Sequence, residues 1–156
     1  MTLLPFFEWC EATALGLAVR ESVWLFPAIE AVHLLGLCLL GGALLIVDLR
    51  MVGAGLTRTP VALLARQARP WLVAGVVTMM ATGVLLFLSE AIKCYYSQAF
   101  WVKITTLPLA LLFTFAVRER VAAASHVAGA PVAATGALSI ALWVIVAAAG
   151  RWIGFS

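Results

Sequence analysis

Four long runs of apolar residues dominate the chain. They extend from Val23 to Val47, from Trp71 to Ser89, from Ala99 to Val117 and from Val132 to Gly150. A transmembrane helix needs about 20 mostly apolar residues, and each run reaches roughly that length. The runs are continuous, whereas a membrane β-strand alternates apolar and polar residues. The pattern therefore predicts an all-α integral membrane protein whose transmembrane domain, a four-helix bundle, covers residues 23–156.

Residues 1–22 form a separate segment of mixed character. Glu8, Glu11 and Arg20 interrupt its apolar residues. No basic stretch precedes an apolar run, so we expect no cleaved signal peptide. Pro5 suits the first turn of a helix. We expect a short N-terminal interfacial segment that lies along the membrane surface.

The composition narrows the class further. Hydrophobic residues make up 65% of the chain and charged residues 11%, and the mean hydropathy is +1.11. Soluble domains carry about a quarter charged residues. This shortage of charge excludes a soluble monomer, a disordered chain and a nucleic-acid-binding protein. The partner that the composition predicts is the lipid bilayer.

The basic residues divide unevenly between the two ends of the predicted helices. One end carries Arg50, Arg58, Arg66, Arg69, Arg118 and Arg120. The other end carries Arg20, Lys93, Lys103 and Arg151. By the positive-inside rule the arginine-rich end is cytoplasmic. We therefore expect a multi-pass protein of the bacterial inner membrane with both termini in the periplasm.

Ionisable residues within a transmembrane helix are costly and usually functional. The first predicted helix holds Glu30, His33 and Asp48. At about 100° per residue, Glu30 and Asp48 return to one face of the helix, and His33 lies about 60° from them. Gly41 falls on the same stripe, which we expect to face the protein interior. Gly41 and Gly42 would let another helix approach this stripe closely.

Two further polar groups lie near the helix ends. Asp48 and Arg50 are near neighbours, so we expect them to pair locally or to contact lipid headgroups. At the opposite end we expect four charged residues to surround one cavity: Glu90, Lys93, Lys103 and Arg151. Cys10 and Cys94 also fall at that end, where a disulfide between them is one alternative.

His33 is the principal candidate for a cofactor ligand. A single imidazole inside the membrane suits a haem iron, a copper ion or a quinone oxygen, and the alternative is a histidine hydrogen-bonded within the bundle. We expect His33 near the bilayer centre and His126 about 20 Å away, too far to share one iron. The candidates for a second ligand are Lys103, Met79, Met80, water or a residue of a partner chain. Glu30 and His33 have the spacing of a di-iron motif, but such sites need two motifs and more acids.

The order of these residues resembles that of a known family. The segments that carry the likeness are Ile29-Glu30-Ala31-Val32-His33-Leu34-Leu35-Gly36, Val47-Asp48-Leu49-Arg50, Thr82-Gly83-Val84-Leu85-Leu86-Phe87, Phe100-Trp101-Val102-Lys103 and Ala149-Gly150-Arg151-Trp152-Ile153-Gly154-Phe155. Over nearly its whole length the chain resembles a bacterial family of small uncharacterised membrane proteins, a domain of unknown function.

A more distant resemblance concerns chemistry. The order of His33, Thr82-Gly83, Lys103 and the arginines after the third helix is similar to the copper-resistance D family and to the HemJ-type protoporphyrinogen oxidases. The HemJ-type resemblance implies haem b with His33 as a ligand and Lys103 as a second essential group. The copper-resistance resemblance makes copper the alternative.

Together these observations predict a small membrane protein that binds a redox cofactor, haem b at His33, and passes electrons to or from a quinone or a periplasmic partner. One alternative is a non-enzymatic subunit or assembly module, either homo-oligomeric or part of a larger complex. The small residues of the last helix favour it: Ala133, Ala134, Gly136, Ala137 and Ala141. A second alternative is a transporter of protons, metal or a small solute along the stripe of Glu30, His33 and Asp48. No residue is assigned a catalytic role.

Overall fold

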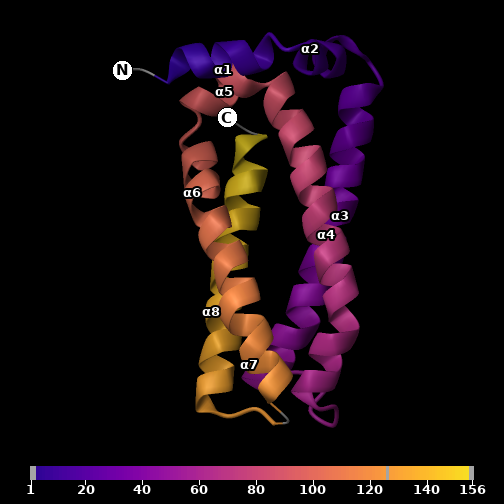
Figure 1. Cartoon of the computed structure of the whole chain (residues 1–156), viewed down its shortest axis with the longest axis vertical. Coiled ribbons are helices and arrows are strands. Elements are labelled where there is room, and N and C mark those ends of the chain that lie inside the picture. Colours follow the sequence, from indigo (N-terminus) through magenta and orange to yellow (C-terminus); the bar gives the residue numbers. More distant parts are fainter. Residues whose placement is uncertain (1–2, 126, 155–156) are drawn as a thin grey trace.

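A computed structural model describes residues 3–125 and 127–154. Four helical stretches in it are long and apolar enough to cross a membrane, which confirms the all-α four-helix membrane bundle. They are α3 (Leu25–Val52), α4 (Val61–Ser89), the continuous stretch Gln98–Ala124, and α8 (Ala130–Ile153). Figure 1 shows the four running side by side along the long axis of the molecule.

The third stretch is one helix in three parts. It begins as α6 (Gln98–Phe113), passes through the π-helical turn η1 (Thr114–Arg118) and ends as α7 (Glu119–Ala124). A π-helical turn shifts the side chains that follow it around the helix, and such turns often occur at functional sites. Here η1 ends at Arg118, a buried arginine.

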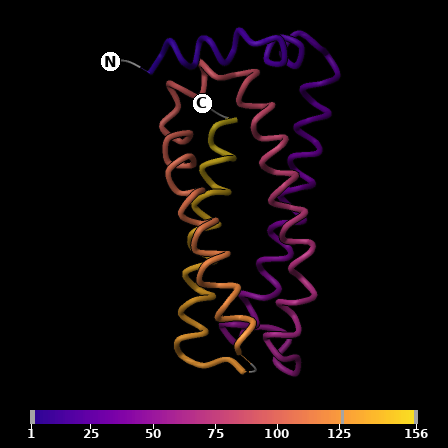
Figure 2. Tube along the Cα trace, in the orientation of Figure 1, coloured from indigo at the N-terminus to yellow at the C-terminus, as the bar shows by residue number. Residues whose placement is uncertain are grey.

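Three short helices cover one end of the bundle, which we name the cap end. They are α1 (Leu4–Glu11), α2 (Ala14–Glu21) and α5 (Ala91–Tyr96). The trace in Figure 2 shows the N-terminal segment running across this end, over the ends of the long helices. The predicted interfacial segment is therefore two helices. They are separated at Thr13, whose side chain accepts a hydrogen bond from the Gly16 amide at 3.2 Å and begins α2.

The cap is anchored by aromatic packing and one hydrogen bond. Phe7 is buried, and its ring contacts a set of aromatic side chains from the long helices and α5: Phe87, Tyr95, Phe100 and Trp101. The Glu11 carboxylate accepts a hydrogen bond of 2.7 Å from the Ile92 amide at the start of α5. Because these contacts join α1 to the helix ends, the cap is an integral part of the fold.

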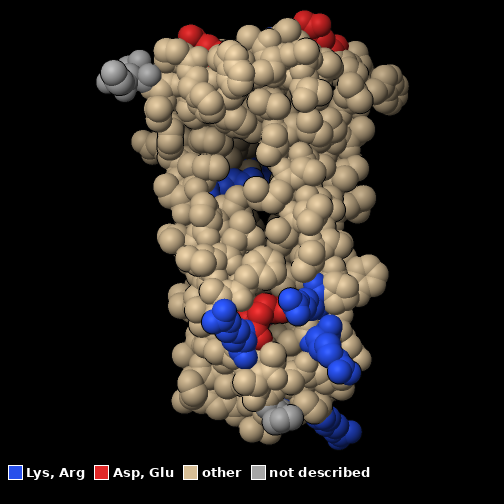
Figure 3. All heavy atoms as spheres, in the orientation of Figure 1, with Lys and Arg blue, Asp and Glu red and all other residues tan. Residues whose placement is uncertain are grey.

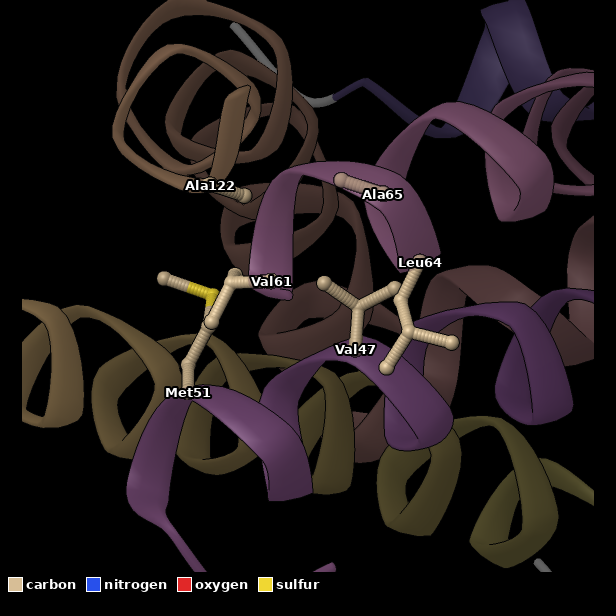
Figure 4. Close-up of a cluster of buried hydrophobic side chains, with 6 residues drawn as sticks. All are labelled: Val47, Met51, Val61, Leu64, Ala65 and Ala122. Carbon is tan, nitrogen blue, oxygen red and sulfur yellow. The ribbon is translucent and has the colours of Figure 1, made fainter. Parts of the chain in front are cut away.

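The opposite end, which we name the arginine end, holds the loops between α3 and α4 and between α7 and α8. Its core joins side chains from three helices: Val47, Met51, Val61, Leu64, Ala65 and Ala122. Figure 4 shows Val47 and Met51 of α3 projecting toward the first turns of α4, beside Ala122 of α7. This packing explains why α4 begins at Val61 and not at Trp71. The exposed Arg66 and Arg69 lower the hydropathy of this segment, so the sequence pattern does not reveal its apolar face, which is buried against α3 and α7.

The other boundaries differ less. α3 continues to Val52 and ends at Gly53, whose φ of 88° is the left-handed conformation that glycine adopts readily. The last helix begins at Ala130 and ends at Ile153, slightly longer at both ends than the prediction.

The glycines that allow close helix contacts are not the two that we predicted. A Cβ at Gly41 or Gly42 would meet nothing within 4 Å. A Cβ at Gly75 would lie 2.9 Å from the Leu40 backbone, and one at Gly136 would lie 2.9 Å from the Asp48 carbonyl oxygen. The first contact joins α3 to α4 and the second joins α3 to α8. The prediction from Gly41 and Gly42 was wrong because helical spacing alone does not reveal which face of α3 meets a neighbour.

Candidate functional site

His33 of α3 is held by the neighbouring helix α4. Its Nδ1 lies 2.7 Å from the Thr82 hydroxyl oxygen, and that hydroxyl donates a 2.6 Å hydrogen bond to the Thr78 carbonyl oxygen. A hydroxyl has one proton, so the Thr82 oxygen is left to accept, and the His33 Nδ1–H is the donor. The lone pair of a neutral imidazole then lies on Nε2. No residue of the described ranges 3–125 and 127–154 forms a hydrogen bond with that Nε2.

This arrangement orients the imidazole before any ligand binds. A histidine that binds a metal commonly donates its second ring N–H to a fixed acceptor, which sets the tautomer and the ring orientation. Thr82 is itself buried, so its oxygen is a fixed acceptor. Next to it, a Cβ at Gly83 would lie 3.4 Å from the His33 ring, and glycine keeps this space clear. The site thus presents one imidazole nitrogen that can coordinate a metal or accept a proton.

His33 lies closer to the cap end than we predicted. α3 runs from Leu25 to Val52, so its midpoint is near Cys38. At about 1.5 Å per residue, His33 is about 8 Å from that midpoint. The offset arises because α3 extends past Val47 at the arginine end, and the depth of His33 in the bilayer stays a prediction. His126, the other histidine, lies outside the described residues.

Lys103 of α6 is the second candidate group. A Cβ at Gly150 of α8 would lie 3.2 Å from the Lys103 Nζ. The Lys103 ammonium therefore lies against α8 at a glycine, which has no side chain. Lys103 is half-buried on α6. It forms no ion pair or hydrogen bond with any described residue. Lys103 is therefore a cation without an ion-pair partner among the described residues.

The two helix pairs are separated by a hollow toward the cap end. α3 packs mainly against α4, and α6 against α8. On the face shown in Figure 3, a hollow opens in the half of the molecule nearest the cap, with Lys or Arg atoms inside it. The polar stripe on α3 becomes less buried toward the cap end. Asp48 is buried, a Cβ at Gly41 would meet nothing within 4 Å, and Glu30 is exposed. The predicted inward orientation therefore agrees with the burial of Asp48, whereas Glu30 is exposed.

A second polar cluster closes the bundle at the arginine end. The Arg118 Nε donates to Asp48 Oδ1 at 2.7 Å, and the Ser139 hydroxyl donates to Asp48 Oδ2 at 2.7 Å. Arg118 also donates to the Leu44 carbonyl oxygen at 3.2 Å and to Glu119 at 2.6 Å. The Asp48 and Arg118 side chains are each only 1% exposed. This cluster joins α3, η1 and α8 in one buried network.

The buried pair corrects the predicted local pairing of Asp48 with Arg50. Arg50 instead donates a 2.6 Å hydrogen bond from Nε to the Thr59 carbonyl oxygen in the loop before α4. The sequence placed Arg118 among the loop arginines, and the distant resemblance included it without a role. Its partner is distant in sequence, and the π-helical turn that aims it inward has no clear sequence pattern. The one usable signal was Asp48 itself, an acid inside an apolar run that needs a buried cation.

The remaining charged candidates do not surround one cavity. Lys93 lies 3.8 Å from Glu90 in a largely exposed pair. Arg151 is exposed near the end of α8. Of the predicted group, only Lys103 turns toward the interior, against Gly150.

The two methionines named as second ligands have different surroundings. Met79 packs in the cluster of Leu40, Ala43, Leu44 and Leu72, between α3 and α4. Met80 is exposed on α4.

Cys10 and Cys94 are both buried free thiols in one apolar cluster with Phe7 and Ala91. Burial raises the pKa of the Cys10 thiol. Burial and the Glu90 carboxylate raise the pKa of the Cys94 thiol from 9.0 to about 11, although Lys103 and Lys93 oppose this effect. The disulfide alternative is therefore absent from this structure, and both thiols are kept in the unreactive protonated form.

The raised pKa of Cys94 predicts slow alkylation in the folded protein. At about pH 9 the thiolate fraction should be about 50-fold lower than in the unfolded chain. The folded state disfavours the Cys94 thiolate, so the protonated thiol contributes to the stability of the fold. This contribution is complete below pH 9 and is lost as the pH rises toward 11. Iodoacetamide labelling followed by peptide mass spectrometry, in mild detergent and after unfolding, measures the ratio. Equal rates in the two states would contradict the buried position of Cys94.

The donor set limits which cofactors the site can hold. Within the described ranges, no group of three or more His, Cys, Asp and Glu side chains could hold a metal ion. A di-iron or multi-ligand copper centre therefore has no ligand set in that part of the chain. A haem iron, which is held mainly by its porphyrin, needs only one or two protein ligands. His33, oriented by Thr82 and with its Nε2 without a partner in the described chain, fits that requirement.

Comparison with known proteins agrees with the resemblance seen in the sequence. A family model described as a family of unknown function (DUF6644) matches residues 6–156. No curated protein and no solved structure matches the chain. The distant likeness to the copper-resistance D and HemJ-type proteins stays a prediction.

Proposed function

Since the chain belongs to this family of unknown function, we propose its activity from the site itself: it is a small membrane protein that binds haem b through His33. It passes electrons to or from a quinone or a periplasmic partner. The observation that carries the proposal is the hydrogen-bond chain from His33 through Thr82 to Thr78, which leaves the His33 Nε2 without a partner.

The protein supplies the ligand, the orientation and the surroundings of the cofactor. Thr82 holds the imidazole in the tautomer that coordinates through Nε2. Lys103 provides an ammonium without an ion-pair partner in the described chain, which suits a cofactor carboxylate or a second ligand position. When bound, haem b would supply one-electron chemistry at a potential set by its ligands and by the apolar surroundings.

We also infer the orientation from the distribution of charge. The arginine end carries six arginines and two acids, Asp48 and Glu119, for a net charge of +4. The cap end carries four basic residues and five acids, Glu8, Glu11, Glu21, Glu30 and Glu90, for a net charge of −1. The positive-inside rule counts only Lys and Arg, here six against four, and it favours a cytoplasmic arginine end and a periplasmic cap in a bacterial inner membrane. The His33 site would then lie in the periplasmic half of the bilayer, which suits a periplasmic electron partner.

An absorption spectrum with metal analysis of the purified protein tests the proposal. Haem b gives a Soret band and iron near one equivalent per chain, and reduction sharpens the visible bands. Copper without a Soret band would replace haem by the copper alternative. A folded protein with neither signal would refute the redox proposal and leave the assembly-module and transporter alternatives. A His126→Ala variant serves as a control, because its band should match that of the wild type.

A further inference from the structure

A lateral opening lies between α4 and α6, in the half of the bundle nearest the cap. α4 packs against α3 and, at the arginine end, against α7, whereas α6 packs mainly against α8. Near the cap the Phe87 ring of α4 stacks on the Phe100 ring of α6, with the ring centroids 5.5 Å apart. Between these two contacts α4 and α6 separate, and the hollow of Figure 3 lies between their places in Figure 1. Because both helices belong to candidate membrane spans, the opening faces the lipid.

The inner faces of the helices become less buried toward this opening. One face of the third long helix carries residues spaced three or four apart: Lys103, Leu107, Ala110 and Thr114. Ala110 and Thr114 are buried, whereas Leu107 and Lys103, nearer the cap, are half-buried. On α3, a Cβ at Gly41 would meet nothing within 4 Å, although Gly41 lies on the same stripe as the buried Asp48. The lateral opening therefore leads to free space along faces that are core-facing elsewhere in the bundle.

The cation on this inner face is Lys103. Its Nζ lies against Gly150 of α8, and it forms no hydrogen bond or ion pair with any described residue. The other basic residues of the cap end lie elsewhere: Arg20 on α2, Lys93 on α5, and Arg151, which is exposed in the last turn of α8. A lysine near a helix end commonly extends its ammonium into water, but Lys103 directs it toward a neighbouring helix. An ammonium inside an apolar bundle needs an anion, and the described chain does not supply one.

The depth of Lys103 indicates the kind of anion. α6 begins at Gln98, so Lys103 lies about 8 Å along the helix from its cap end. Trp101 is two residues away, and Trp152 of α8 is exposed at the same end. Tryptophans mark the membrane–water interface, so the ammonium lies just below the lipid headgroups. An anion at this depth with free apolar space beneath it is the head of an amphiphile.

We propose that the lateral opening binds an amphiphilic carboxylate that enters from the bilayer between α4 and α6. The Lys103 ammonium donates to the carboxylate, and the apolar body of the ligand lies beside Leu107 and Gly41. A long-chain fatty acid and a porphyrin with propionate groups share this chemistry. The proposal does not require a cofactor on His33, so it is tested separately from haem binding.

Photolabelling with a fatty acid tests the proposal. The full chain in phosphatidylcholine nanodiscs is illuminated with palmitic acid that carries a diazirine in its chain, and in parallel with the matching alcohol. We expect the acid to half-saturate the labelling at a concentration roughly 10- to 100-fold lower, because only the carboxylate forms a charge-assisted hydrogen bond with Lys103. Peptide mass spectrometry should place the label on α4 and α6. Repeating the labelling with haem-loaded protein distinguishes the two sources: competition assigns the site to porphyrin propionates, and undiminished labelling assigns it to a lipid carboxylate.

Matched variants separate this site from general partition into the membrane. Lys103→Gln should lose the preference for the acid over the alcohol, and Lys103→Arg should keep most of it. Lys93→Gln removes an exposed cation from the same end and should keep the preference in full. Gly41→Leu should weaken labelling by both probes while circular dichroism shows an intact fold, because a Cβ at Gly41 meets nothing within 4 Å. Equal labelling by acid and alcohol in the wild type, or equal loss in Lys103→Gln and Lys93→Gln, would overturn the proposal.

Discussion

Replacing Asp48 by alanine is expected to destabilise the protein by about 3–5 kcal/mol, the usual cost of breaking a buried ion pair from one side. The alanine leaves the Arg118 guanidinium in a buried position with only the Leu44 carbonyl oxygen and Glu119 as acceptors. It also removes the acceptor of the Ser139 hydroxyl. Because the network joins α3, η1 and α8, its loss should loosen the arginine end as a whole. Unfolding in mixed detergent micelles, followed by far-ultraviolet circular dichroism, measures the change.

Two comparisons isolate the ion pair. Arg120→Met removes an exposed arginine two residues away and should change stability by less than about 0.5 kcal/mol. The double variant Asp48→Leu/Arg118→Met removes both buried charges, and it should be more stable than either single variant. An Asp48→Ala protein as stable as Arg120→Met would show that the pair does not hold the helices together.

His33→Ala is expected to abolish cofactor binding, with loss of the Soret band and of bound iron. The variant removes the only imidazole among residues 3–125 and 127–154, and the described chain offers no group of several ligands in its place. His33 is half-buried, so the smaller side chain should leave the fold intact. Absorption spectra normalised to protein concentration, together with circular dichroism, distinguish loss of cofactor from loss of fold. A full Soret band in His33→Ala would remove His33 from the site.

Thr82 provides a graded version of the same experiment. Thr82→Val keeps the shape of the side chain but removes the acceptor of the His33 Nδ1–H, so haem affinity should fall about 10- to 100-fold. Thr82→Ser keeps the hydroxyl and should bind nearly as well as the wild type. Haem titration of the apoprotein measures both. If valine and serine behave alike, the hydrogen bond from His33 does not orient the ligand.

The sequence was sufficient for the class of fold because the membrane constrains it so strongly. Every backbone polar group within the hydrocarbon must be satisfied locally, so a long apolar run can only be a helix there. The four long helices follow from this constraint. Helix ends were less predictable, because hydropathy does not detect apolar side chains such as Val61 and Leu64 that alternate with exposed arginines.

The candidate site was predictable in its members and not in its contacts. Glu30, His33 and Asp48 stood out because ionisable groups are rare in apolar helices. Their roles then diverged: Glu30 is exposed, His33 is bound to Thr82, and Asp48 is paired with Arg118. None of these outcomes can be read from helical spacing, which gives the face of one helix but not the neighbour that this face meets.

The sequence by itself therefore determined the membrane class, the number of long apolar helices and the few residues whose chemistry matters. These properties depend on composition and local order along the chain. Only the tertiary structure decided which arginines are buried and which are free, which nitrogen of His33 is left without a partner, and where the helix pairs separate. These properties depend on contacts between helices distant in sequence, such as Asp48 of α3 with Arg118 of η1 and Ser139 of α8. A buried charge must find a partner, and the fold alone determines which partner is within reach.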